Sequence, residues 1–179
     1  MSETYERTIK PILPKTFDEN EWFAIFITEL VLSAVYYVTI KNRKLLWSQI
    51  ICISLLNLQM TTVGDYFLAM PPYDFYDTVD RNSGELTDVF LQNIVYPGTV
   101  LFIMHWYKRI PLNKLSFLVL SVLLLSTLEG ISVYFFHLFT YKSWKFYYSV
   151  IFYTITMVLN LVFYEKLHNF LQGRMAAAK

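Results

Sequence analysis

The stretch 115–140, with the sequence LSFLVLSVLLLSTLEGISVYFFHLFT, decides the fold class of this chain. Glu129 is its only acidic residue, and it contains no lysine or arginine. A helix needs about 20 mostly apolar residues to cross the hydrocarbon core of a bilayer, where no water can satisfy the backbone. We therefore predict a transmembrane helix over these residues.

Four further segments have the same character, at 22–40, 45–70, 89–107 and 144–164. The chain has 179 residues, of which 55% are hydrophobic and 16% are charged. A soluble domain carries about 25% charged residues, so this composition argues against an ordinary soluble protein. The sequence predicts an all-α protein, an integral membrane bundle of about five transmembrane helices, with the lipid bilayer as a partner. No basic stretch suits nucleic acid.

The basic residues indicate an orientation, because cytoplasmic loops carry an excess of lysine and arginine. Nine lie on one side of the predicted helices: Lys41, Arg43, Lys44, Lys108, Arg109, Lys114, Lys166, Arg174 and Lys179. Six lie on the other: Arg7, Lys10, Lys15, Arg81, Lys142 and Lys145. We therefore expect a multi-pass protein of the cell membrane, with the tail 1–21 outside and the tail 166–179 in the cytoplasm. Tryptophans at both sets of ends, Trp22 and Trp144 outside and Trp47 and Trp106 inside, fit an aromatic belt.

The first 21 residues lack the basic start and apolar core of a cleavable signal peptide, so we expect the first span to stay in the protein. Thr16 and Glu19 fit a capping box at the start of that span. Pro11 and Pro14 favour an irregular tail before it, with a short surface helix as the alternative.

Polar side chains inside the spans are costly and need a reason. Glu29, Asp65 and Glu129 are the carboxylates, and all three fall in the outer half of the membrane when depth is counted at 1.5 Å per residue. Ser54, Asn57, Thr61 and Asp65 recur on one helix face, which should turn toward the bundle interior. The candidate polar site consists of Glu29, Asn57, Thr61, Asp65, Asn93, Glu129 and His137.

Two interpretations of this polar layer stay open. Its members either hydrogen-bond one another and lock the helices, or they form a water-accessible site, open to the outside, for a cation, a proton or a polar head group. Pro97 and Gly98 should kink the third span. The carbonyl freed by the proline could point into the polar layer, or the kink could serve packing alone.

The loop 71–88 between the second and third spans is acidic. It holds Asp74, Asp77, Asp80, Glu85 and Asp88, with Arg81 as its only basic residue. Asp77, Asp80 and Asn82 are spaced loosely like calcium ligands, but the EF-hand pattern is absent, so we expect a solvated loop and no metal site. A lid folded over the polar layer is the alternative.

Several short motifs resemble a known family. They are Gly64-Asp65-Tyr66, Pro71-Pro72, Tyr96-Pro97 and Leu128-Glu129-Gly130. Together they are similar to an uncharacterised family of small multi-pass membrane proteins from Bacillus- and Clostridium-type bacteria. The resemblance implies a bacterial cytoplasmic membrane and a helical bundle with Asp65 and Glu129 inside, and it implies no activity.

Three functions remain open, and none calls for a cofactor. The favoured one is a binding or accessory protein whose outer face meets a membrane protein partner or a small polar or cationic ligand. The alternative is a small proton- or cation-coupled transporter or a transporter subunit, although inverted repeats are lacking. An enzyme is third, because no catalytic motif is present and only Glu129 and His137 could serve as an acid–base pair.

Overall fold

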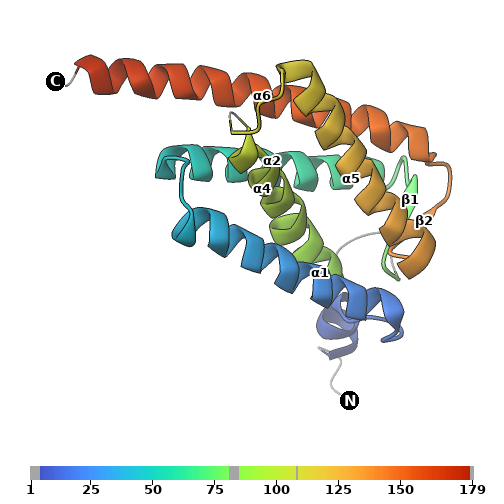
Figure 1. Cartoon of the computed structure of the whole chain (residues 1–179). Coiled ribbons are helices and arrows are strands. Elements are labelled where there is room, and N and C mark those ends of the chain that lie inside the picture. The colour runs from blue at the N-terminus through green and yellow to red at the C-terminus, as the bar shows by residue number, and fades with distance from the viewer. Residues whose placement is uncertain (1–4, 81–84, 108, 178–179) are drawn as a thin grey trace.

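The computed structural model describes residues 5–80, 85–107 and 109–177. Five of its helices are long and apolar enough to cross a membrane: Glu19–Lys41, Trp47–Leu68, Leu86–Trp106, Lys114–Phe136 and Phe146–Arg174. The protein is therefore a multi-pass membrane protein, and the predicted all-α bundle is confirmed (Figure 1). Lys108 and Lys179, used for the orientation, and Arg81 and Asn82 of the acidic loop lie outside the described residues.

The helical elements follow one another as α1 (Glu19–Tyr36), a π-helical turn η3 (Tyr37–Lys41), α2 (Trp47–Leu68), α3 (Leu86–Phe90), a π-helical turn η4 (Leu91–Val95), α4 (Tyr96–Trp106), α5 (Lys114–Phe136) and α6 (Phe146–Ala177). Two short helical turns, η1 (Tyr5–Ile9) and η2 (Lys10–Ile12), precede them, so the tail is closer to the surface-helix alternative. α2 packs against both α4 and α6, α5 packs along α6, and α1 packs against α4 and η4.

The third span is built from three pieces, α3, η4 and α4, because Pro97 lies near the start of α4. Proline has no amide hydrogen to offer the preceding turn, and π-helical turns are one way for a helix to absorb such a break. In the π-helical register the amide of residue 97 would have met the carbonyl of Gln92. That carbonyl instead accepts a hydrogen bond from the Thr61 hydroxyl at 3.0 Å. The freed carbonyl thus faces α2, inside the bundle.

Gly98 lets α1 and α4 come close together. A β-carbon placed there would lie 2.5 Å from Cγ1 of Val31 and 3.0 Å from Cγ2 of Val35. Both valines are β-branched and stiff in a helix, so neither can move aside easily. The sequence marked Gly98 only as part of a kink, whereas the structure gives it this packing role.

A small two-stranded sheet closes one end of the bundle, which we call the sheet end. β1 (Tyr76–Thr78) pairs antiparallel with β2 (Phe139–Tyr141), and Asp77 lies opposite Thr140. α5 ends at Phe136 rather than at residue 140, because His137 adopts a left-handed conformation with φ 49°. The Leu138 amide then donates to the Ser132 carbonyl at 3.0 Å, which terminates the helix.

Part of the acidic loop packs against the rest of the protein, so a solvated loop is the wrong interpretation for residues 74–80. Thr78 and Val79 are buried. Lys142, beyond β2, forms ion pairs with Asp74 at 2.7 Å and Asp77 at 2.8 Å. Residues 74–80 of the loop therefore form part of the sheet end, and the lid over the polar layer stays a prediction.

The start of α1 also differs from the expected one. Asp18 is the N-cap residue, and its backbone amide donates to Oε2 of Glu21 at 2.8 Å. The Asn20 amide donates to Oδ1 of Asp18 at 3.2 Å. The capping box is thus Asp18 with Glu21, and Thr16 instead donates to Asp18. Aspartate caps a helix at least as well as threonine. The sequence therefore allowed either capping box, Thr16 with Glu19 or Asp18 with Glu21.

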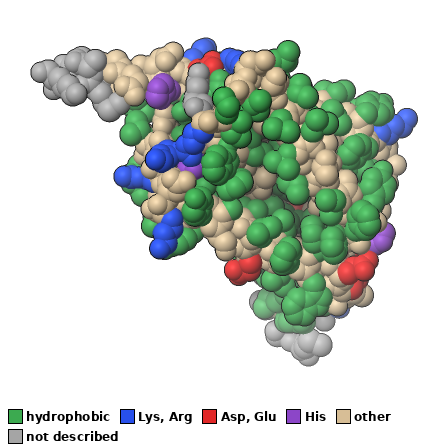
Figure 2. Space-filling model, viewed as in Figure 1, with side chains coloured by type: hydrophobic (Ala, Val, Ile, Leu, Met, Phe, Trp, Pro, Cys, Tyr) green, Lys and Arg blue, Asp and Glu red, His purple; other side chains and the backbone are tan. Residues whose placement is uncertain are grey.

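Polar and apolar surfaces are separated along the bundle. Figure 2 shows hydrophobic side chains over most of one face, while lysine and arginine gather mainly at the end where α1 meets α2 and α4 meets α5. We call this the basic end. α6 runs on as a helix through most of the stretch predicted as a tail, to Ala177, and extends past the other helices (Figure 1). Its 32 residues span about 48 Å, more than the roughly 30 Å of a hydrocarbon core.

Candidate functional site

The bundle encloses a cavity of about 350 Å³ that reaches from the middle of α2 to the sheet. Its walls come from α1, α2, η4, α4, α5 and α6, and the two strands close one side. Most of the lining is apolar or aromatic, including Phe23, Phe26, Ile27, Met60, Val95, Leu125, Leu128, Phe139 and Phe152. Two carboxylates, Asp65 and Glu129, lie in this lining. A concave apolar site with a few polar groups is typical of small-molecule binding sites.

Glu129 of α5 is buried, with 9% of its surface exposed. Its Oε1 accepts a hydrogen bond from the Ser149 hydroxyl at 2.6 Å and a short one from the Tyr141 hydroxyl. The Trp144 indole donates to the Ser149 hydroxyl at 2.8 Å, which orients it. No lysine, arginine or histidine pairs with Glu129 in the described part of the chain. Neutral donors from β2 and α6 therefore satisfy this carboxylate.

Asp65 of α2 lies beside the strand β1. Its Oδ1 accepts from the Tyr76 hydroxyl at 3.2 Å, and its Oδ2 accepts from the Gln92 amide at 2.8 Å. The same amide also donates to Asp88 at 2.8 Å. Gln92 thus links two carboxylates across the bundle, and Tyr76 brings the loop onto the cavity.

Asn57 and Thr61 occupy the deeper part of the cavity wall. Asn57 is 1% exposed and exchanges two hydrogen bonds with Asn160 of α6, at 2.7 Å and 2.9 Å. Each asparagine also donates to a carbonyl of its own helix. This amide pair ties α2 to α6 with its polar groups satisfied, as a membrane interior requires.

Three of the seven candidate residues do not belong to the cavity. Glu29 is exposed on the outer face of α1, and Asn93 is exposed and donates to the Val89 carbonyl at 2.7 Å. His137 is exposed beyond the end of α5, with Nε2 at 3.8 Å from Glu19. The predicted span 115–140 placed it on one helix with Glu129, but α5 ends before it. The structure therefore brings together Asn57, Thr61, Asp65 and Glu129 only.

Sequence reasoning missed most of the hydrogen-bond donors of this site. Tyr141 and Ser149 on Glu129, Tyr76 on Asp65 and Asn160 on Asn57 were all unassigned. Asn160 carried a usable signal, because it is an amide within an apolar span. The tyrosines carried none, since the chain has 14 and their interfacial role is common.

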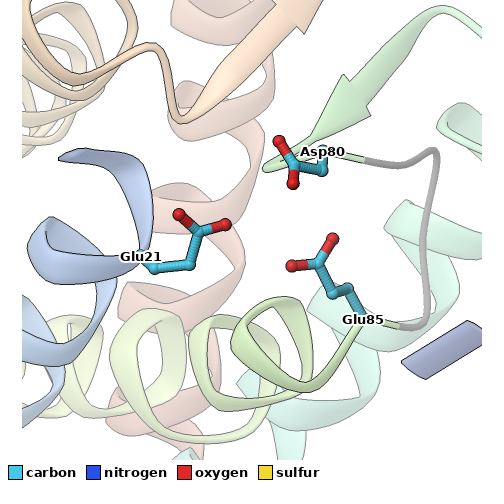
Figure 3. Close-up of side chains that lie close together, drawn as sticks. All are labelled: Glu21, Asp80 and Glu85. Carbon is cyan, nitrogen blue, oxygen red and sulfur yellow. The ribbon is translucent and has the colours of Figure 1, made fainter. Parts of the chain in front are cut away.

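A second carboxylate cluster lies outside this cavity. Glu21 at the start of α1, Asp80 after β1 and Glu85 before α3 each offer an oxygen within 4.8 Å of the others (Figure 3). None of the three lines the cavity. No metal site was predicted here, because Glu21 is distant in the sequence from the other two residues.

The cavity combines a mainly apolar lining with the carboxylates of Asp65 and Glu129. Its walls fit an apolar body, and Glu129 provides an acceptor or negative charge at the sheet end. The acid–base pair of Glu129 with His137 does not form, since His137 is on the surface beside Glu19.

Comparison with known protein families, curated proteins and solved structures finds no match to this chain. Function is therefore inferred from the residues of the cavity. The likeness to small membrane proteins of Bacillus- and Clostridium-type bacteria stays a prediction.

Proposed function

We propose that this chain is a binding or accessory protein of the cell membrane, and that its cavity takes a small ligand with an apolar body and a cationic end. The observation that carries this is Glu129, a buried carboxylate on the wall of a mainly apolar cavity. A buried carboxylate is costly in a membrane unless a cation or a proton accompanies it. Hydroxyl donors lower that cost, and a cationic ligand would remove most of the rest.

The proposed orientation puts the sheet end, and hence the cavity, toward the outside of the cell. The basic side chains at the opposite end support it, because lysine and arginine favour the cytoplasmic side. Lys142 counts against this orientation, because it lies at the sheet end, on the side proposed to face outward. Its ion pairs with Asp74 and Asp77 reduce that objection, since its charge is balanced locally.

The test uses 2-phenylethylamine as a probe and 2-phenylethanol as its uncharged counterpart. Isothermal titration calorimetry on the full chain in lipid nanodiscs, with empty nanodiscs subtracted, measures both affinities. The amine should bind at least tenfold more tightly than the alcohol, because only the amine can pair with Glu129. Glu129→Gln should bring the two affinities within about twofold while leaving the alcohol unchanged.

Glu29→Gln is the matched control, since it neutralises a carboxylate on a span but outside the cavity. It should keep the preference for the amine. Equal binding of the two probes by the unaltered protein, or an unchanged preference in Glu129→Gln, would contradict the proposal.

Coupled transport is the second candidate, because Asp65 and Glu129 lie on different helices around one cavity. Uptake of radiolabelled 2-phenylethylamine into proteoliposomes separates it from simple binding. Uptake that depends on a proton gradient and is lost in Glu129→Gln would favour a transporter. Binding without uptake would favour the binding protein.

A further inference from the structure

Glu21, Asp80 and Glu85 bring three carboxylates together at the sheet end. One oxygen from each lies within 4.8 Å of the other two, and Figure 3 shows the three side chains directed toward one another. Glu21 and Glu85 are 0% exposed. Three like charges this close repel one another strongly when little water screens them.

Two of these carboxylates each keep a buried oxygen that has no hydrogen-bond partner among the residues that the structure describes. Oε2 of Glu21 accepts from the Asp18 amide, but Oε1 is buried with no hydrogen bond. Oε1 of Glu85 accepts from the Thr87 hydroxyl at 3.1 Å, but Oε2 is buried with no hydrogen bond. A buried charged oxygen without a donor is costly, so these two atoms point to a bound positive ion.

The third carboxylate is held in place by the N-terminal tail. Oδ2 of Asp80 accepts from the backbone amides of Lys15 at 2.9 Å and Thr16 at 3.0 Å. The Lys15 ammonium group binds the Asp80 carbonyl oxygen at 2.7 Å. These bonds fix the side chain of Asp80 beside the two glutamates.

Glu85, which lies just before the third span, shows the electrostatic consequence. Burial, followed by the nearby charges of Asp80 and Glu21, raises the pKa of its carboxyl group, although the bond from Thr87 opposes this. Each cause that raises the pKa disfavours the ionised form when no cation is bound.

We propose that Glu21, Asp80 and Glu85 form a binding site for a hard divalent cation of the calcium class. All three ligands supply carboxylate oxygens, which calcium prefers, whereas zinc sites favour nitrogen and sulfur. The cation would tie the start of α1 to the end of β1 and the start of α3. It would therefore hold Asp80, next to the buried Val79, against the start of α1.

The experiment uses the full chain in nanodiscs, stripped with EDTA and dialysed, with calcium chloride as the probe. Calorimetry should find one saturable site per chain, with a Kd of about 10⁻⁵ to 10⁻³ M, the range of weaker calcium sites. Calcium at 100 times the Kd should raise the Tm by about 5–10 °C, because it binds only the folded chain. Glu85→Gln should weaken calcium binding at least tenfold.

Glu19→Gln is the matched control, since Glu19 lies in the same first turn of α1 but is 62% exposed and turned toward His137. It should bind calcium as the unaltered protein does. If Glu85→Gln does not fold, Asp80→Asn replaces it and should also lose at least tenfold, with Asp77→Asn as its control. The absence of a saturable site up to about 10 mM calcium, or an equal loss in the control variants, overturns the proposal.

Discussion

Glu129 and Glu85 are both buried carboxylates, but their neighbours are of opposite kinds. Glu129 is surrounded by hydroxyl donors from Tyr141 and Ser149. Glu85 accepts a hydrogen bond from the Thr87 hydroxyl and faces the carboxylates of Glu21 and Asp80. Hydroxyl groups of the protein lower the cost of burying Glu129, whereas the carboxylates that face Glu85 raise the cost of ionising it and favour a cation or a proton from solution. Removing a neighbour should therefore harm the fold at Glu129 and help it at Glu85.

The largest effect is expected from removing the donors of Glu129. Tyr141→Phe combined with Ser149→Ala should lower the free energy of unfolding by about 2–4 kcal/mol, because a buried carboxylate loses two hydrogen bonds. Denaturant titration of the protein in micelles, followed by circular dichroism, measures this change. Thr127→Ala is the control, since that exposed hydroxyl of α5 bonds only the Leu123 carbonyl.

Adding Glu129→Gln to that double variant distinguishes the cause. If the unsatisfied charge produces the loss, the neutral amide should recover at least half of it. No recovery would mean that packing of the Tyr141 ring, and not the carboxylate, produces the loss.

The amide pair Asn57–Asn160 offers a neutral comparison with Glu129. Asn160→Leu should lower the free energy of unfolding by about 1–2 kcal/mol, because the Asn57 side chain loses its interhelical partner but carries no charge. The double variant Asn57→Leu with Asn160→Leu should lose less than the single one, since no polar group is then left unpaired. The same denaturant titration measures both, and a greater loss in the double variant would contradict this account.

The smaller effect at the acidic cluster should have the opposite sign. In EDTA, the native state holds a proton on Glu85 more tightly than the unfolded chain does, because its pKa is raised. Unfolding therefore becomes easier as the pH rises from the ordinary value of 4.5 through the raised value. Glu85→Gln should raise the Tm in EDTA near pH 8 by about 2–4 °C and flatten this pH dependence.

Differential scanning fluorimetry between pH 5 and pH 8 follows this trend. Asp80 and Glu21 are the carboxylates that face Glu85, and Glu19→Gln, at an exposed carboxylate, serves as the control. Saturating calcium should reverse the trend, because ionised carboxylates then bind the cation. A Tm that rises with pH in EDTA would show that repulsion between these carboxylates does not lower the stability of the protein.

The sequence predicted the spans well because each one is long and apolar by itself. It also placed Asn57, Thr61 and Asp65 on one helix face, since the helical period alone determines that. It could not place His137, because a single left-handed residue ended α5 at Phe136, four residues before the predicted end at residue 140. It could not find the acidic cluster either. That site depends on where the fold brings Asp80 and Glu85 relative to Glu21 at the start of α1, which no local pattern encodes.

The smallest effect is expected at Glu29. It tests whether a carboxylate on a span, but outside both sites, affects the stability of the protein. It is exposed on α1, and its side chain has no hydrogen bond or ion pair with another described residue. Glu29→Gln should therefore change the free energy of unfolding by less than about 0.5 kcal/mol, as for most surface substitutions. A carboxylate on a membrane span is costly where it meets lipid, so a clear loss of stability or of self-association in Glu29→Gln would instead place this residue in a contact with another protein. Denaturant titration and sedimentation of the protein in nanodiscs, with Glu19→Gln alongside, separate these two outcomes.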